Sequence, residues 1–123
     1  MKSDSGDEHR GFDLEERTAR FGESVVAFAK RVPVNAVTYP LIGQVVRSGG
    51  SVGANYCEAN DAESKKDFRH KIGICRKESK ETKHWLRLIA AVEPDLRDTA
   101  AVLWKEAKEL NLIFGAIRRR SGP

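Results

Sequence analysis

Three glycines within five positions, Gly49, Gly50 and Gly53, are the first residues of this sequence whose spacing could do chemistry. A glycine-rich loop can cradle a phosphate when a strand precedes it and a helix follows it. The triphosphate-binding version also ends in Gly-Lys-Ser or Gly-Lys-Thr, whereas Gly53 is followed by Ala54-Asn55. The dinucleotide-binding version needs a GxGxxG pattern, which is absent here. The glycines therefore do not predict a nucleotide site.

The same glycines fit a closely packed helix. From Pro40 onward one helical face is apolar, and Gly49 and Gly53 lie on that face at i and i+4. A glycine inside a helix costs about 1 kcal/mol relative to alanine, which close packing can offset. We therefore predict that Gly49 and Gly53 let a helix over residues 39–60 approach a neighbouring helix closely. The apolar residues of this face are Leu41, Ile42, Val45, Val46, Val52 and Tyr56.

Four polar residues could meet between this helix and the next one, namely Asn55, Glu58, Glu78 and Glu81. Neighbouring carboxylates can serve acid–base hydrolysis or a two-metal site. Metal sites in helical bundles use Glu-x-x-His pairs on two helices, and this chain has that spacing once, at Glu81 and His84. We expect a structural polar network without catalytic residues, metal or cofactor. A hydrolase that uses Glu58, Glu78 and Glu81 is the enzymatic hypothesis.

The two cysteines, Cys57 and Cys75, lie 18 positions apart. Neither belongs to a CxxC pair, and no histidine cluster lies near them, so the spacing of metal ligands is absent. Both are interpreted as small buried apolar residues. A disulfide or a reactive thiol is the alternative interpretation.

Four amphipathic segments must position these residues. Apolar residues recur at alternating steps of three and four, which predicts helices over about residues 13–32, 39–60, 65–92 and 96–120. Pro33 ends the first helix, and Ser64 is predicted to cap the third by accepting the amide of Asp67. Asp95 is the predicted cap of the fourth. Four such helices with short links predict an all-α, antiparallel up-down-up-down four-helix bundle.

Length and composition are those of one ordered globular domain, with 123 residues, 40% apolar and 33% charged. Residues 1–12 are predicted to be a flexible acidic leader, and residues 13–120 form the bundle domain. The first thirty residues contain no apolar run flanked by basic residues, and no stretch approaches a membrane span. A cytoplasmic location without membrane contact is therefore expected.

Positive charge is concentrated behind the leader. The first 16 residues hold six of the 18 acidic and two of the 22 basic residues, which leaves 12 acidic and 20 basic residues in the remainder. On the helical wheel of the third predicted helix, three adjacent positions carry no acidic residue between residues 66 and 87. The basic residues at these positions form a stripe about 30 Å long. The candidate nucleic-acid-binding residues on it are Arg69, Arg76, Lys80, Lys83 and Arg87.

This stripe has two interpretations. It is either an ordinary solvated face or a surface matched to the phosphates of RNA or DNA. No aromatic residue is interleaved on it, so contact with the nucleic-acid backbone is predicted without recognition of bases. The opposite side of the same helix carries Ile74, Trp85 and Leu88 beside Glu78 and Glu81, as a subunit contact or a polar network would.

The segments RSGGSVGANYCEA (47–59) and AESKKDFRHKIGICRKESKETKHWL (62–86) are specific enough to carry a family resemblance. They resemble the four-helix-bundle family named for proteins encoded in intervening sequences of bacterial 23S ribosomal RNA genes, over about residues 12–118. The matching characteristic positions are Ser51, Asn55, Glu58, Lys77, Glu78, Glu81 and Trp85. The acidic leader and the two cysteines depart from the pattern.

The resemblance implies a homopentameric ring with no established enzymatic activity. Related accessory proteins of retroelements use a basic pentamer surface to contact nucleic acid and a reverse transcriptase. Our leading hypothesis is therefore a non-enzymatic oligomeric bundle that contacts nucleic-acid backbone through the stripe. The alternative is a protein-interaction or scaffold ring that does not bind nucleic acid.

Overall fold

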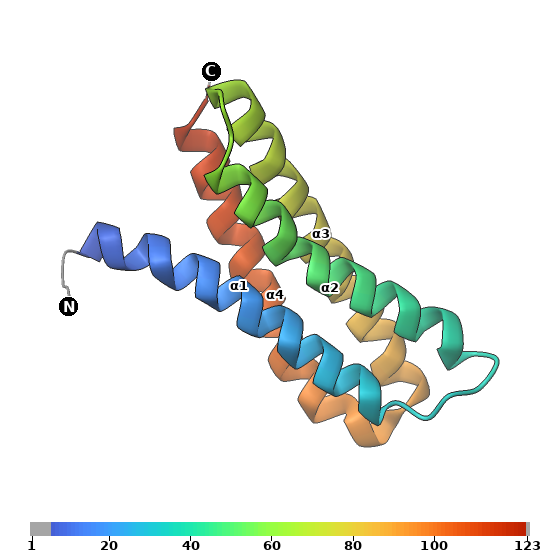
Figure 1. Cartoon of the computed structure of the whole chain (residues 1–123). Coiled ribbons are helices and arrows are strands. Elements are labelled where there is room, and N and C mark those ends of the chain that lie inside the picture. Colours follow the sequence, from blue (N-terminus) through green and yellow to red (C-terminus); the bar gives the residue numbers. More distant parts are fainter. Residues whose placement is uncertain (1–5, 123) are drawn as a thin grey trace.

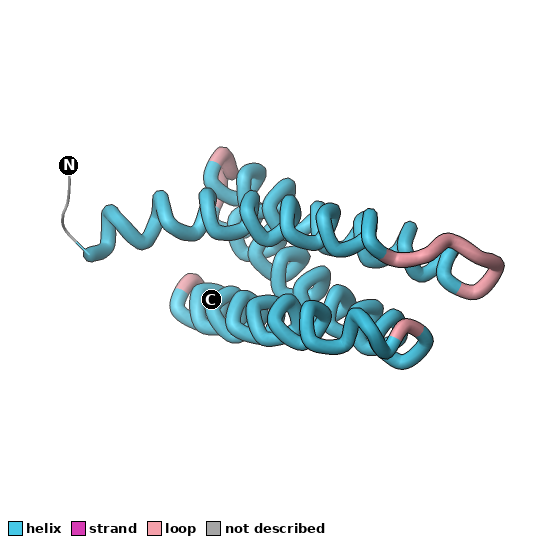
Figure 2. The backbone as a smooth tube through the Cα atoms, turned by 90° about the horizontal axis from the view of Figure 1, so that it is seen from below, coloured by secondary structure: helices cyan, strands magenta, loops and turns pink. Residues whose placement is uncertain are grey.

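The protein is an all-α bundle of four antiparallel helices, which confirms the predicted architecture (Figure 1). The computed structural model describes residues 6–122, and it describes the side chains of residues 14–122. The helices run up, down, up and down, and Figure 2 shows the connecting loops at the two ends of the bundle. The elements are α1 (Gly6–Arg31), α2 (Thr38–Asn60), α3 (Lys65–Val92), the 3₁₀ helix η1 (Pro94–Leu96) and α4 (Arg97–Arg120).

The start of α1 differs from the sequence-based boundary. The helix begins at Gly6 and so includes residues 6–12 of the predicted leader. Charged residues such as Glu and Arg are good helix formers, so a polar segment can extend a helix that no proline interrupts. Residues 1–5 lie outside the described residues, and the flexibility of the leader stays a prediction. The carboxyl end of α1, at Arg31, agrees with the stop expected from Pro33.

Two side chains organise the starts of α2 and α3. Asn35 Oδ1 accepts hydrogen bonds from the amides of Val37 and Thr38, each at 2.9 Å. Ser64 Oγ accepts the amide of Asp67 at 3.0 Å, which confirms the predicted cap of α3. Each bond satisfies an amide that the first turn of a helix would otherwise leave unpaired.

The predicted cap of α4 was wrong. Pro94 begins a 3₁₀ turn, and α4 starts after Leu96 without a side-chain cap. Asp95 is exposed, whereas Leu96 is buried in the core. Burial of Leu96 therefore sets the entry into α4, and the carboxylate of Asp95 does not cap the helix.

The apolar faces predicted from the three-and-four spacing form the core. Phe28, Ile72, Leu86 and Phe114 are among its largest fully buried side chains, one or two from each of α1, α3 and α4. Val45 and Val52 complete the core from α2. Where α2 meets α3, the buried Thr82 donates a hydrogen bond to Ser48 Oγ at 2.9 Å. This bond defines which levels of the two antiparallel helices face each other.

The glycines of α2 face α1. A Cβ atom added to Gly49 would lie 2.8 Å from Cγ1 of Val25, and one added to Gly53 would lie 3.3 Å from the carbonyl oxygen of Thr18. Both glycines are buried, and Val25 is completely buried. Gly50 points away from these contacts, since its added Cβ would meet nothing within 4 Å. Close approach of α1 and α2 therefore depends on Gly49 and Gly53.

None of the helices in residues 6–122 combines the length and the hydropathy of a membrane span. This agrees with the amphipathic pattern of each helix, in which charged residues occupy the outer face.

Candidate functional site

The predicted basic stripe lies along the seam between α3 and α4. Asn111 of α4 donates a hydrogen bond to the carbonyl oxygen of Arg76 at 2.7 Å, and the Nζ atom of Lys83 lies 5.1 Å from the ring centroid of Trp104. Later residues of α3 thus face earlier residues of α4, as antiparallel packing requires. The stripe is therefore one side of a two-helix surface.

The five candidate residues on α3 keep different degrees of exposure. Arg76, Lys80 and Arg87 are exposed, whereas Arg69 and Lys83 are half-buried against the seam. The half-buried pair can cover apolar atoms with their stems while their charged ends reach solvent. The structure thus brings all five residues onto the same side of α3, next to α4.

The carboxyl end of α4 adds arginines that the stripe on α3 did not include. A Cβ atom on Gly73 of α3 would lie 3.2 Å from Nε of Arg118, and one on Gly115 of α4 would lie 3.6 Å from Nε of Arg76 and 3.5 Å from Nη1 of Arg119. The guanidinium groups of these arginines therefore lie close to glycines of the seam. The stripe predicted from the sequence did not include Arg118 and Arg119, because the register between α3 and α4 was not known.

We call the combined surface the basic face. It consists of Arg69, Arg76, Lys80, Lys83 and Arg87 from α3, with Lys108, Arg118 and Arg119 from α4. Within residues 14–122, no side chain of the basic face forms a salt bridge with a carboxylate. The Nε atoms of Arg69 and Arg118 are covered and have no hydrogen-bond acceptor among those residues. The basic face is an accumulation of positive charge that the described part of the chain does not neutralise.

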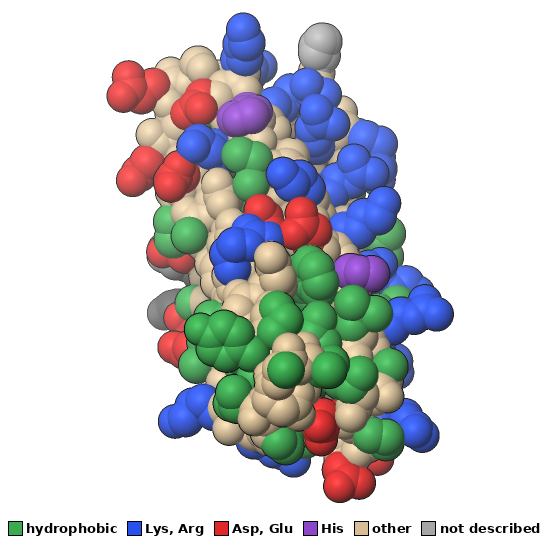
Figure 3. Space-filling view, turned by 90° about the vertical axis from the view of Figure 1, so that its right-hand side faces the viewer, with side chains coloured by type: hydrophobic (Ala, Val, Ile, Leu, Met, Phe, Trp, Pro, Cys, Tyr) green, Lys and Arg blue, Asp and Glu red, His purple; other side chains and the backbone are tan. Residues whose placement is uncertain are grey.

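Figure 3 shows Lys and Arg side chains gathered along one edge of the molecule, beside a face on which apolar side chains are exposed. The separation of the two kinds of side chain follows from α3, which contributes to both. Its residues of the basic face lie on the side of α4, whereas Trp85 and Leu88 share the side of Glu78 and Glu81, which pair with Arg47 of α2.

The four residues predicted to form one polar network do not all meet. Arg47 of α2 instead bridges two of them, with Nη2 at 2.7 Å from Oε1 of Glu81 and Nη1 at 3.3 Å from Oε1 of Glu78. The hydrogen bond to Glu78 is the main cause that raises the pKa of Arg47. This arginine was missed because its acceptors lie on another helix, so only the register of α2 against α3 identifies it.

The other two members have separate partners. Asn55 donates from Nδ2 to the carbonyl oxygen and to Oγ of Ser51, each at 2.9 Å, within its own helix. Glu58 pairs with Nζ of Lys71 at 2.5 Å, and this hydrogen bond raises the pKa of Lys71. The predicted network is thus corrected to three local clusters, because the residues lie at different levels of the α2–α3 pair. Each of the three glutamates that could serve a hydrolase is paired with a cation.

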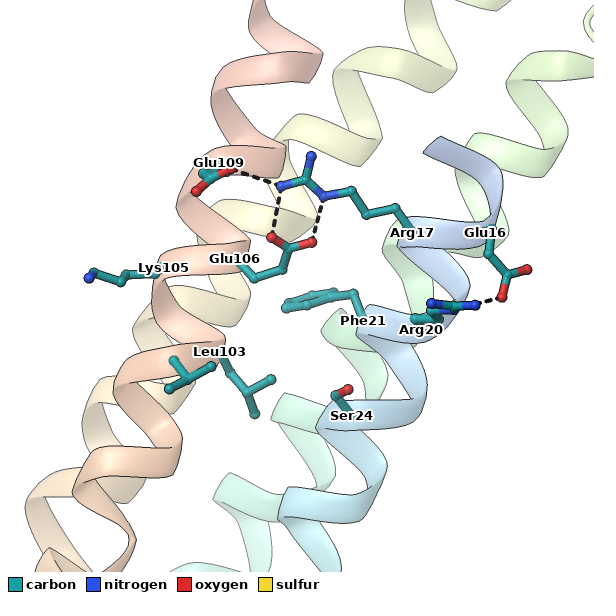
Figure 4. Close-up of a pocket in the computed structure, with 10 residues that line it drawn as sticks. Glu16, Arg17, Arg20, Phe21, Ser24, Leu103, Lys105, Glu106 and Glu109 are labelled. Atoms are coloured by element: carbon teal, nitrogen blue, oxygen red, sulfur yellow. Dashed lines mark hydrogen bonds and ion pairs between the residues drawn. The ribbon is translucent and has the colours of Figure 1, made fainter. Parts of the chain in front are cut away.

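A groove of about 720 Å³ lies between α1 and α4 (Figure 4). Arg17 spans it, donating from Nε to Oε2 of Glu106 at 2.7 Å and from Nη2 to Oε1 of Glu106 at 2.8 Å and of Glu109 at 2.9 Å. The hydrogen bonds to these carboxylates raise the pKa of Arg17. The bidentate pair neutralises Arg17 and Glu106 and links the two helices, so we assign it a structural role.

An apolar face lies where α2 and α3 meet near the α1–α2 loop. It consists of Val37, Leu41, Trp85, Leu88 and Val92, of which Val37 is 58% and Val92 is 42% exposed. Leu41 precedes Ser48 by two turns and Leu88 follows Thr82 by almost two turns, so both reach the same level of the pair. The indole Nε1 of Trp85 is covered but has no acceptor among residues 14–122.

The cysteines do not share one environment. Cys75 is completely buried, and burial raises the pKa of its thiol to about 12. Cys57 is exposed, which corrects the interpretation of both cysteines as buried residues. Both thiols are free. In the described part of the chain, no group of three or more His, Cys, Asp or Glu side chains could hold a metal ion.

The fold and its surfaces define a class of protein, namely an antiparallel four-helix bundle with a basic face on one helix pair and an apolar face on another. The chain belongs to the 23S rRNA-intervening sequence protein family, whose sequence profile matches residues 12–115. The family resemblance noted from the sequence is thereby confirmed.

A solved structure agrees with this assignment. The chain is similar to a protein of unknown function from the S23 ribosomal protein family of Bacteroides thetaiotaomicron VPI-5482, with 30% sequence identity and a TM-score of 0.78. The similarity covers 85% of this chain and 97% of the other. No curated protein sequence matches the chain.

Proposed function

We propose that this protein is a non-enzymatic, oligomeric helical bundle that contacts the backbone of nucleic acid through the basic face. The observation that carries the proposal is the group of arginines across the α3–α4 seam that lacks any carboxylate partner in residues 14–122. An ordinary protein surface mixes charges of both signs. Guanidinium groups bind phosphate with two parallel hydrogen bonds, so an unpaired group of them suits a polyphosphate.

The dimensions of the basic face support a backbone ligand. Residues 66–87 of α3 extend about 30 Å along the helix, which is long enough to meet several successive phosphates. The carboxylates of the neighbouring helices are directed elsewhere, since Glu106 and Glu109 pair with Arg17 on the α1 side of α4. A polyanion that follows the basic face therefore does not meet the carboxylates of Glu106 and Glu109.

The first expected result is a strong dependence of binding on salt. Each phosphate contact releases bound counterions, so five contacts to a single strand give a log–log slope of about −3.5. Raising the salt from about 50 mM to about 200 mM should then weaken binding roughly 100-fold. Fluorescence anisotropy with labelled RNA and DNA oligonucleotides measures this slope. Binding that does not change with salt, or no binding to either polymer at the lower salt, contradicts the proposal.

The oligomeric part of the proposal rests on the apolar face. Val37 and Val92 expose much of their side chains to solvent. A second copy of the chain can cover these valines and remove their apolar surface from water. We propose a homopentamer, as the family resemblance implies, in which this face meets a different face of the next subunit. Five basic faces on one ring would increase the avidity for a long polyanion.

The mass in solution tests the assembly. Light scattering should give about 68 kDa for five chains of 13.7 kDa. The double variant Val37→Asp/Val92→Asp should lower this mass, because burying two carboxylates in an interface is costly. The matched control Val26→Asp/Val102→Asp changes valines that are 44% and 68% exposed elsewhere. A monomeric wild-type protein, or dissociation by the control pair instead, contradicts the assigned interface.

The apolar face also favours a second candidate function, a protein-interaction or scaffold ring that does not bind nucleic acid. In that case another protein covers the apolar face, and the basic face meets an acidic partner or keeps the ring soluble. A pull-down with and without nuclease separates the two functions. Capture that survives nuclease favours the scaffold, whereas capture that nuclease abolishes favours nucleic-acid binding.

A further inference from the structure

The basic face contains an aromatic residue that the sequence of α3 does not reveal. Trp104 of α4 is half-buried and lies level with Lys83 of α3. The Nζ atom of Lys83 is 5.1 Å from the centroid of the Trp104 ring, and the Nζ atom of Lys108 is 5.7 Å from it. Two ammonium groups thus lie over one indole. The predicted stripe on α3 contains no aromatic residue. The packing of α4 against α3 places Trp104 beside it.

A small hollow lies beside this indole. Its volume is about 280 Å³, and it is lined by Leu86, Arg87, Ala90, Ala100, Ala101 and Trp104. The three alanines leave the space open, the leucine and the indole make it apolar, and the arginine supplies positive charge at its edge. Pockets for drug-sized ligands measure roughly 300–1,000 Å³, so this hollow suits a single planar ring system.

We propose that Trp104 stacks with one unpaired base of a bound single strand, while Lys83, Arg87 and Lys108 contact the phosphates beside that base. This inference rests on the proposed function, and it adds that the ligand is single-stranded. Every base has a planar π face that can stack on an indole, so the site does not require a particular sequence. The bases of a duplex are already paired and stacked, and they cannot enter the hollow without being extruded.

The lysines do not block the ring. A cation that lies over an exposed aromatic ring contributes less than a base that stacks on it. An arriving base can therefore displace the ammonium group of Lys83, whose flexible stem lets it move to an adjacent phosphate. The exchange replaces one cation–π contact with a stacking contact and an ion pair. In the free protein, the lysines keep the indole covered and the surface hydrated.

The test compares single-stranded and duplex oligonucleotides of the same sequence at one salt concentration. Trp104→Leu keeps an apolar side chain but removes the stacking surface, and it should weaken single-strand binding about tenfold. Duplex binding and the salt dependence should stay unchanged. Trp104→Phe keeps an aromatic ring and should retain most of the single-strand affinity. Equal losses for both ligands, or no loss for either, overturn the inference.

A second measurement uses the native Trp104. In the variant Trp85→Phe the fluorescence of Trp104 is observed alone, and a single strand should quench it by stacking whereas the duplex should not. An unquenched signal at saturating single strand overturns the inference even if Trp104→Leu fails to fold. If binding depends on salt but the fluorescence of Trp104 is not quenched and Trp104→Leu keeps its single-strand affinity, the proposed function is supported and the stacking site is refuted. If neither the single strand nor the duplex binds at low salt, both the proposed function and the stacking site are refuted.

Discussion

Gly49→Leu is expected to lower the free energy of unfolding by about 3 kcal/mol or more, because the added atoms have no room. Even the Cβ atom would lie 2.8 Å from Cγ1 of Val25, which is completely buried. Val25 cannot turn into solvent, so α1 and α2 must move apart. The gain in helix propensity returns only about 1 kcal/mol. Thermal unfolding should show a Tm lower by about 10 °C or more.

Gly50 provides the matched control. It is the next residue of the same helix, it is exposed, and an added Cβ would meet nothing within 4 Å. Gly50→Leu should therefore be neutral or should raise the free energy of unfolding by up to about 1 kcal/mol through helix propensity. The opposite signs at adjacent positions separate packing from propensity. Equal changes in Tm for the two variants would contradict the packing role of Gly49.

The cause can be located with Val25. Val25→Ala removes the two methyl groups that Gly49→Ala would meet, at the cost of a cavity in the wild-type background. The double variant Val25→Ala/Gly49→Ala should therefore be more stable than the sum of the two single changes in unfolding free energy predicts. Strict additivity would show that the strain at Gly49 is not directed at Val25.

Local patterns were sufficient to predict the bundle. The alternation of three and four residues is a property of each helix by itself, and it identified buried positions such as Val45, Val52 and Tyr56. Ser64 could be predicted as a cap because its acceptor and donor are three residues apart. Gly49 and Gly53 could be placed on the packing face because they are in phase with the apolar residues of their own helix.

Features that depend on the register between helices could not be predicted in the same way. Glu78 and Glu81 were expected to meet Asn55, but the α2–α3 register places Arg47 beside them. Trp104 joins the basic face only because α4 runs antiparallel to α3 at that level. A periodic pattern defines the face of a helix, and it leaves open which residue of the neighbour lies opposite.

The basic face supports the second large prediction. Changing Arg69, Arg76, Lys80, Lys83 and Arg87 to glutamine should weaken binding to a single strand by on the order of 100-fold or more at physiological salt. The log–log slope with salt should become smaller in magnitude by up to about 3.5, because five phosphate contacts are lost. Glutamine keeps most of each side-chain stem, so the packing against α4 should survive. A thermal unfolding curve verifies that the fold is retained.

Net charge alone could produce part of such a loss, so the control variant must remove the same charge elsewhere. Five exposed basic residues that lie outside the basic face, Arg20, Lys30, Arg31, Arg97 and Lys105, can be changed to glutamine together. Each variant removes five positive charges from a formal net charge of +4, which leaves −1 in both. Long-range attraction depends on the total charge, and it should weaken similarly in both proteins. Only the loss of direct phosphate contacts should reduce the salt slope further, so equal affinities and equal slopes would refute the basic face as the binding surface.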